Sequence, residues 1–186
     1  AEQAFRLDCL QQLLDLSPAN RWWACKQAVK TLEDGLSGDN ADGKALKLWR
    51  DRLRQAQQAE DRAWDETTET PFFQSISRHD LNEFELGECQ SDLARCQPIA
   101  SAWLVRKNLT EFAYRRCYLL FIDLPGLKDD ERYALCRSLE HTLDLPGPVL
   151  VLWAGDAPTL DDIQRNAFNP IFVQNRQNAQ VSARYA

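Results

Sequence analysis

A short stretch of the chain, residues 118–132, constrains the fold more than any other part of the sequence. It reads YLLFIDLPGLKDDER: a continuous apolar run ends in an aspartate, and a Pro-Gly pair then leads into a charged segment. Such a run is typical of a strand, and the Pro-Gly pair indicates a tight turn. Helical spacing follows over about 128–143, and PVLVLWAG at 148–155 predicts a strand of the buried type. The sequence therefore predicts strand, helix and strand in succession.

The first 66 residues contain no such apolar run and have helical spacing throughout. Apolar side chains recur every three or four residues, which predicts helices over about 2–16, 18–36 and 44–66. We expect a helical hairpin followed by a long helix, and we interpret residues 1–66 as a helical region. The polar, β-branched stretch TTETP at 67–71 is the expected domain boundary.

Residues 72–173 are expected to form an α+β domain, a mixed β-sheet with flanking helices that contains the order α-β-β-α-β. The pair Asp80 and Glu83 indicates a capping box before its first helix. The polar tail, residues 174–186, has little pattern, and we expect little regular structure in it. The sequence predicts a short strand over about 72–76, a helix over 81–96 and a hairpin of two strands over 100–108 and 115–123. A helix over 128–143, a strand over 148–155, a short helix over 159–167 and a last strand over 169–173 are expected to follow.

The composition excludes several classes of partner. The chain has 186 residues, with 22 Lys+Arg against 28 Asp+Glu and a net charge of −6. We expect no nucleic-acid partner, because such binding requires a positive field. We also expect no direct membrane insertion, because no apolar run approaches the roughly 20 residues that span a bilayer. The six cysteines lack zinc-type spacing, so we expect reduced side chains and a cytoplasmic location.

The string D-L-P-G also occurs in GTPases, where a strand closes on D-x-P-G near the γ-phosphate. Here the next helical turn carries Asp129, Asp130 and Glu131, which complement the helix dipole and repel a phosphate. Residues 38–45, GDNADGKA, fit G-x-x-x-x-G-K but place Ala45 where a magnesium-binding Ser or Thr is needed. We therefore expect no nucleotide cofactor and interpret the Pro-Gly pair as a turn from strand to helix.

Two aspartates suggest an alternative function. Asp123 and Asp156 each follow a predicted strand, and neighbouring parallel strands would place both carboxylates at one sheet edge, where they could share Mg²⁺. The chain would then be a divalent-metal-dependent phosphoryl-transfer or hydrolytic enzyme. Aspartate is also common as a turn residue after a strand, and no general base or nucleophile accompanies the pair, so we expect no catalytic residue.

Basic residues flank the connection of the predicted hairpin. Arg106, Lys107, Arg115 and Arg116 could form a local patch that contacts RNA or a phosphorylated partner. The simpler interpretation is a solvated hairpin end.

The helical region offers candidates for a protein interface. Adjacent helical residues point about 100° apart, so Trp22 lies on the apolar face of its helix and Trp23 points elsewhere. Exposed aromatic and arginine side chains are favoured interface anchors. Our candidates are Trp23, Trp64, Arg50 and Arg54, and the favoured function is a non-catalytic protein–protein interaction or regulatory module with a protein partner.

Two resemblances add to these expectations. Residues 80–153 carry LARCQPIASAWLV, CYLLFID and PVLVLW around a helix, an arrangement that resembles the small C-terminal domain of SseB-type (enhanced serine sensitivity) proteins, a non-catalytic module. The whole chain resembles the cytosolic C-terminal region of bacterial membrane-bound HtpX-like zinc proteases. The second resemblance implies an accessory region of a larger bacterial protein whose metal motif lies outside this chain.

Overall fold

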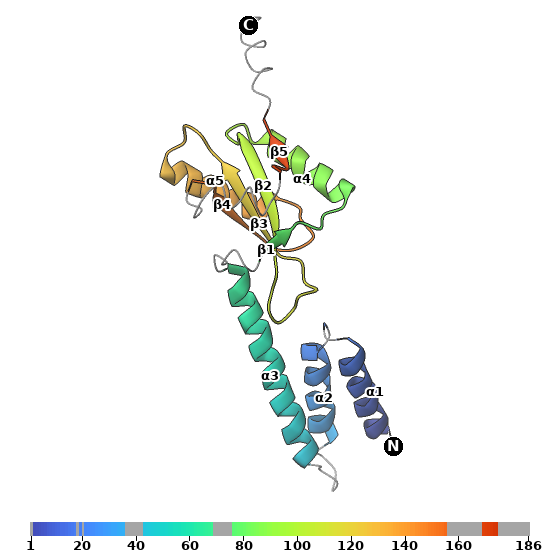
Figure 1. The fold of residues 1–186 in the computed structure, drawn as a ribbon. Coiled ribbons are helices and arrows are strands. Elements are labelled where there is room, and N and C mark those ends of the chain that lie inside the picture. Colours follow the sequence, from blue (N-terminus) through green and yellow to red (C-terminus); the bar gives the residue numbers. More distant parts are fainter. Residues whose placement is uncertain are drawn as a thin grey trace, which may run out of the picture. The chain divides into compact units, whose positions relative to one another are not determined.

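Figure 1 shows the fold in a computed structural model, which describes residues 2–17, 19, 21–35, 43–68, 76–155 and 169–174. The chain divides into two compact units, Ala1–Asp65 and Glu66–Ala186. The described residues form five helices and a mixed five-stranded sheet, which confirms the α+β fold class. The predicted helix at 159–167, most of the predicted strand at 72–76 and nearly all of the 174–186 tail lie outside the described residues.

The first unit contains α1 (Glu2–Leu16), α2 (Arg21–Gly35) and most of α3 (Gly43–Thr68), close to the predicted ranges. In its core, one face of α2 packs against the first two turns of α3, where Leu46 and Trp49 are buried. Partly buried leucines of α1 pack against this cluster. Farther along α3 the buried positions are alanines, Ala56, Ala59 and Ala63, which continue the predicted apolar seam.

The second unit is built on the sheet. Its elements are β1 (Ile76–Arg78), α4 (Glu83–Arg95), β2 (Ser101–Lys107), β3 (Tyr118–Asp123), α5 (Asp129–Thr142), β4 (Val149–Trp153) and β5 (Phe172–Val173). The strand order is β1-β2-β3-β4, with β5 also paired to β2. The pairs that involve β2 are antiparallel, whereas β3 and β4 are parallel and are connected through α5. The predicted hairpin and the strand-helix-strand order are both present.

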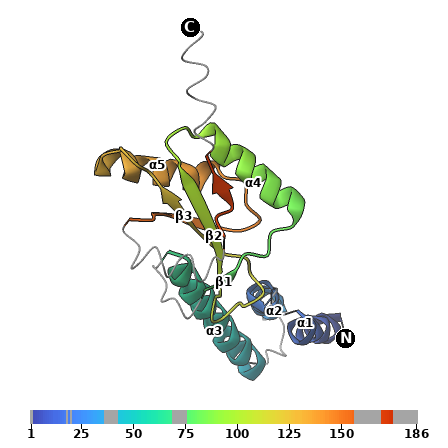
Figure 2. The same cartoon turned by 45° about the horizontal axis from the view of Figure 1, so that its top comes forward.

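Side chains alternate between the two faces of the sheet, so each face has its own apolar cluster. Leu104, Leu120 and Ile122 face α4 and α5, and together with buried side chains of both helices they form the larger cluster. Trp103 and Phe121 belong to the cluster on the other face of the sheet. Figures 1 and 2 show α4 and α5 lying along the sheet. Both faces of β2 and β3 are buried, whereas in β4, the strand predicted to be buried, only Val151 is buried and its neighbours are partly exposed.

The connection between β2 and β3 spans residues 108–117 and is longer than the sequence suggests. Leu109 and Phe112, which lie between the two predicted strands, are both buried and fix the connection to the domain. The Lys107 N–H donates to the Cys117 carbonyl at 2.8 Å and closes it.

Two helix starts show how local chemistry sets the boundaries. Gly126 has a φ of 83°, and with Pro125 before it this is the geometry of a type II turn. The Glu131 carboxylate then accepts the Lys128 N–H at 2.9 Å, so one donor at the start of α5 is occupied by the helix itself. The predicted capping box of Asp80 with Glu83 is wrong: the box joins Asn82 and Glu85.

The Pro-Gly turn gives a stability prediction with a matched control. Gly126→Ala should destabilise the protein by about 1–2 kcal/mol, because an alanine at positive φ is strained even though nothing crowds its Cβ. Gly87→Ala, inside α4 and equally uncrowded, should stabilise the protein by up to about 1 kcal/mol. Urea unfolding of both variants checks this, and equal effects of the same sign would contradict it.

Candidate functional site

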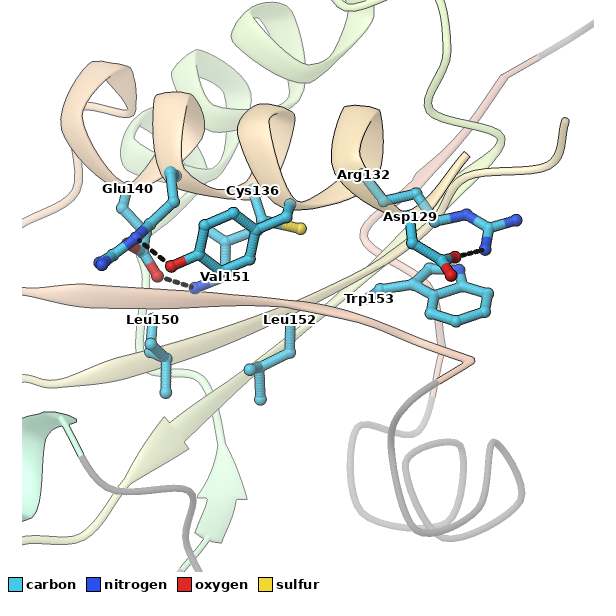
Figure 3. Close-up of a pocket in the computed structure, with 10 residues that line it drawn as sticks. Asp129, Arg132, Cys136, Glu140, Leu150, Val151, Leu152 and Trp153 are labelled. Atoms are coloured by element: carbon cyan, nitrogen blue, oxygen red, sulfur yellow. Dashed lines mark hydrogen bonds and ion pairs between the residues drawn. The ribbon is translucent and has the colours of Figure 1, made fainter. Parts of the chain in front are cut away.

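A groove of 510 Å³ runs between α5 and β4 (Figure 3). It has an apolar floor and charged groups at both ends. Val151 points toward the helix, whereas Leu150 and Leu152 point away from it. The lining residues are Asp129, Arg132, Tyr133, Cys136, Arg137 and Glu140 from α5 and Leu150–Trp153 from β4.

The strand that lines this groove is at the edge of the sheet among the described strands. The Tyr118 N–H donates to the Pro148 carbonyl, and the Ala154 N–H to the Ile122 carbonyl, both at 2.9 Å. In a parallel ladder this register directs the even-numbered residues of β4 toward β3. The N–H and C=O groups of Val149, Val151 and Trp153 therefore point outward, along the groove.

Glu140 lies at one end of the groove, where it reaches the backbone of Val151. Its carboxylate accepts a hydrogen bond from the Val151 N–H at 3.1 Å and forms an ion pair with Arg137 at 3.4 Å. The Glu140 side chain is only 12% exposed. Glu140 thus takes the place that the backbone carbonyl of an additional strand would occupy. The outward amides of Val149 and Trp153 have no partner among the described residues.

Arg132 lies at the other end of the groove. Its guanidinium stacks on the Trp153 ring, 3.9 Å from Cζ to the ring centroid, and pairs with Asp129 at 2.9 Å. The Arg132 side chain is 20% exposed, whereas that of Asp129 is 92% exposed. The Arg132 Nε is buried and has no hydrogen-bond partner among the described residues. The cation is therefore held by the aromatic ring more than by its carboxylate.

Sequence reasoning did not find this groove. Helical spacing places Tyr133 on the same face as Cys136, Leu139 and Leu143, which predicts a buried side chain. Tyr133 is instead 64% exposed and accepts a hydrogen bond from the Arg137 Nε at 3.2 Å. Arg132 and Glu140 carry no motif. The one available signal was the apolar run of β4, although an apolar run does not show whether its strand lies at an edge.

Of the two aspartates of the metal hypothesis, Asp123 lies within the described residues. Strands β3 and β4 are parallel neighbours, as the hypothesis requires, and Asp123 ends β3. Asp156 lies outside the described residues. Within the described part of the chain, no group of three or more His, Cys, Asp or Glu side chains is arranged to hold a metal ion.

Arg106 and Arg116 of the predicted basic patch take part in internal ion pairs. Arg106 pairs with Asp80 at 2.9 Å, and Arg116 pairs with Glu85 at 2.7 Å and with Asp80 at 3.4 Å. Lys107 is buried, and Arg115 packs over the Phe112 ring. These contacts support the interpretation as a hairpin end.

Asp80 is the centre of a polar network. The buried Tyr118 hydroxyl donates to its carboxylate at 2.7 Å. Desolvation raises the pKa of Asp80, but the Tyr118 hydrogen bond and the Arg106 and Arg116 charges together outweigh it, so the pKa lies below its ordinary value. Burial and the hydrogen bond to Asp80 raise the pKa of Tyr118. The network fastens the segment before α4 to β2 and β3.

The interface candidates of the first unit differ in exposure and pairing. Trp23 and Trp64 are both exposed. Arg50 pairs with Glu33 at 2.7 Å, and Arg54 pairs with Asp51 at 3.0 Å. The two arginines therefore contribute to the helical surface as ion pairs, and the tryptophans contribute its exposed aromatic groups.

Compared with protein-family models, with curated proteins and with solved structures, the chain gives no match. None of the helices in the described residues is long and apolar enough to cross a membrane.

The Asp80 network gives a prediction for the pH dependence of stability. Because the folded-state pKa of Asp80 is below the unfolded value of about 3.9, its contribution is present above that pH and is lost as the pH falls through the folded-state pKa. Asp80→Asn should therefore be less stable than wild type at pH 7, with a difference that narrows below about pH 4.

Urea unfolding between pH 7 and pH 2 measures this difference. Asp92→Asn, which removes a surface partner of Arg95, is the control and should change stability by less than about 1 kcal/mol. A wild-type advantage over Asp80→Asn that stayed constant down to pH 2 would rule out this role of Asp80.

Proposed function

We propose that the second unit is a non-catalytic protein-interaction module that binds an extended segment of a partner protein along the outer edge of β4, beneath α5. The observation that carries the proposal is the edge itself. Its outward backbone groups point along a groove, and one of them is already occupied by a carboxylate. A strand that adds to a sheet edge obtains affinity from backbone hydrogen bonds and specificity from alternate side-chain pockets.

The lining of the groove suits this binding mode. Val151 and Trp153 project from β4 on the side that faces the helix, and Tyr133 and Cys136 line the groove from α5. An added strand would place every second side chain between these walls. The remaining side chains would lie on the opposite face, where Leu150 and Leu152 point.

The same geometry argues against a second copy of this chain as the occupant. A symmetric pair of β4 strands centred on Val151 would bring the two Glu140 carboxylates toward each other, and like charges in direct opposition are destabilising. Glu140 therefore disfavours association between identical edges, as inward-pointing charges do in other sheets. A peptide segment without an acid at this register has no such conflict.

We propose this as the role of a regulatory accessory region of a larger bacterial protein. The resemblances to SseB-type C-terminal domains and to the cytosolic region of HtpX-like proteases support that context. The exposed Trp23 and Trp64 of the helical unit are further candidates for contact with a protein partner.

Selection of binders from a random peptide library displayed on phage, with the full chain as bait, tests the proposal. The best peptide is then resynthesised with a single N-methyl group at each amide in turn. Binding should be lost at every second amide, because only alternate N–H groups of an added strand face β4. Uniform tolerance of N-methylation, or a library without binders, would rule out strand addition at this edge.

Glu140 gives a gain-of-affinity prediction. In the free protein it occupies the Val151 N–H, so Glu140→Ala should bind the selected peptide about tenfold more tightly, because a buried donor is then left for the peptide to satisfy. Glu88→Ala, which removes an exposed carboxylate of α4 outside the groove, should leave the affinity unchanged. Calorimetry measures both, and weaker binding by Glu140→Ala would contradict the competition.

A further inference from the structure

Building on the proposed function, we infer that the groove selects partner segments with an acidic side chain at the position facing Arg132. The inference concerns which peptide binds, whereas the proposed function concerns how any peptide binds. It rests on how Arg132 is held and on which of its donors are occupied.

Arg132 is oriented before any ligand arrives. Stacking on Trp153 fixes the plane of the guanidinium, and the groove leaves the side chain only 20% exposed. A cation over an indole ring is one of the stronger cation–π pairs. A ligand therefore meets a guanidinium whose conformational freedom is already lost, which favours binding.

The hydrogen-bonding capacity of this guanidinium is largely unused. Of its five donors, one N–H is engaged by Asp129, and the Nε has no partner among the described residues. Asp129 is almost fully exposed, so its ion pair is screened by water and is weak. A ligand carboxylate can displace Asp129 and bind the planar fork of donors in a bidentate manner, which an amide cannot match.

The surroundings of Arg132 explain why the anion must belong to a peptide. Asp129, Asp130 and Glu131 in the first turn of α5 oppose any small anion that arrives alone, and Lys128 offsets only one of these charges. An acidic residue within an added strand is held against this repulsion by the backbone ladder. The Glu140 carboxylate at the far end of the groove repels an acidic side chain there. An acidic side chain therefore fits best at the Arg132 end.

The experiment uses the full chain and the peptide chosen by library selection. Each acidic position is changed to its amide, Glu to Gln or Asp to Asn, in a peptide with an amidated C-terminus. At one position the amide should weaken binding to wild type about tenfold, and Arg132→Met should abolish that difference. Free glutamate at millimolar concentration should not compete.

Arg95→Met is the matched control, since Arg95 pairs with Asp92 at 2.9 Å in the same i, i+3 geometry but lies on α4, outside the groove. It should keep the preference for the acid. If peptides bind equally well with the acid or its amide at every position, but binding is still lost on N-methylation of every second amide, this inference is overturned and the proposed function is left intact. A preference for a free C-terminal carboxylate, with no effect of the side-chain amides, would also overturn it.

Discussion

A parallel pair of strands requires a crossover connection, and β3 and β4 obtain theirs from α5. This requirement arranges the second unit. It places α5 over the face of the sheet that contains Val151, and it leaves β4 as the outer strand of the described sheet. The groove exists because the returning helix lies beside the strand that it introduces. The Pro-Gly turn and the acid-rich first turn of α5 make this crossover local and short.

The crossover and the buried strands were predictable because their signals are local. Continuous apolar runs identify β2, β3 and β4, and the spacing between the last two identifies a helix. The three N-terminal helices also follow from their own periodicity. The start of α4 was less predictable, because two acceptors compete for the capping position. Asn82 takes it, and Asp80 is instead engaged by Tyr118, by Arg106 of β2 and by Arg116 in the connection before β3.

The candidate site was not predictable for a related reason. Pattern alone indicates that a strand is buried, but its position in the sheet depends on pairings between distant segments. Tyr133 has the spacing of a core residue and is nevertheless exposed, because α5 covers the edge of the sheet and its outer flank has no described strand beneath it. The roles of Glu140 and Arg132 depend on β4, which begins several residues later in the chain.

The smallest strand has a consequence for the order in which the chain is made. β5 pairs with the start of β2, and Ile171 and Gln174 donate to the Ala102 and Ala100 carbonyls beside it. These partners are about seventy residues apart in sequence. A nascent chain leaving the ribosome can assemble β2, β3 and β4 early, but that flank of β2 stays unpaired until residues 171–174 have been translated. Premature termination before residue 171 would leave those carbonyls without their donors and the start of β2 unpaired on that side.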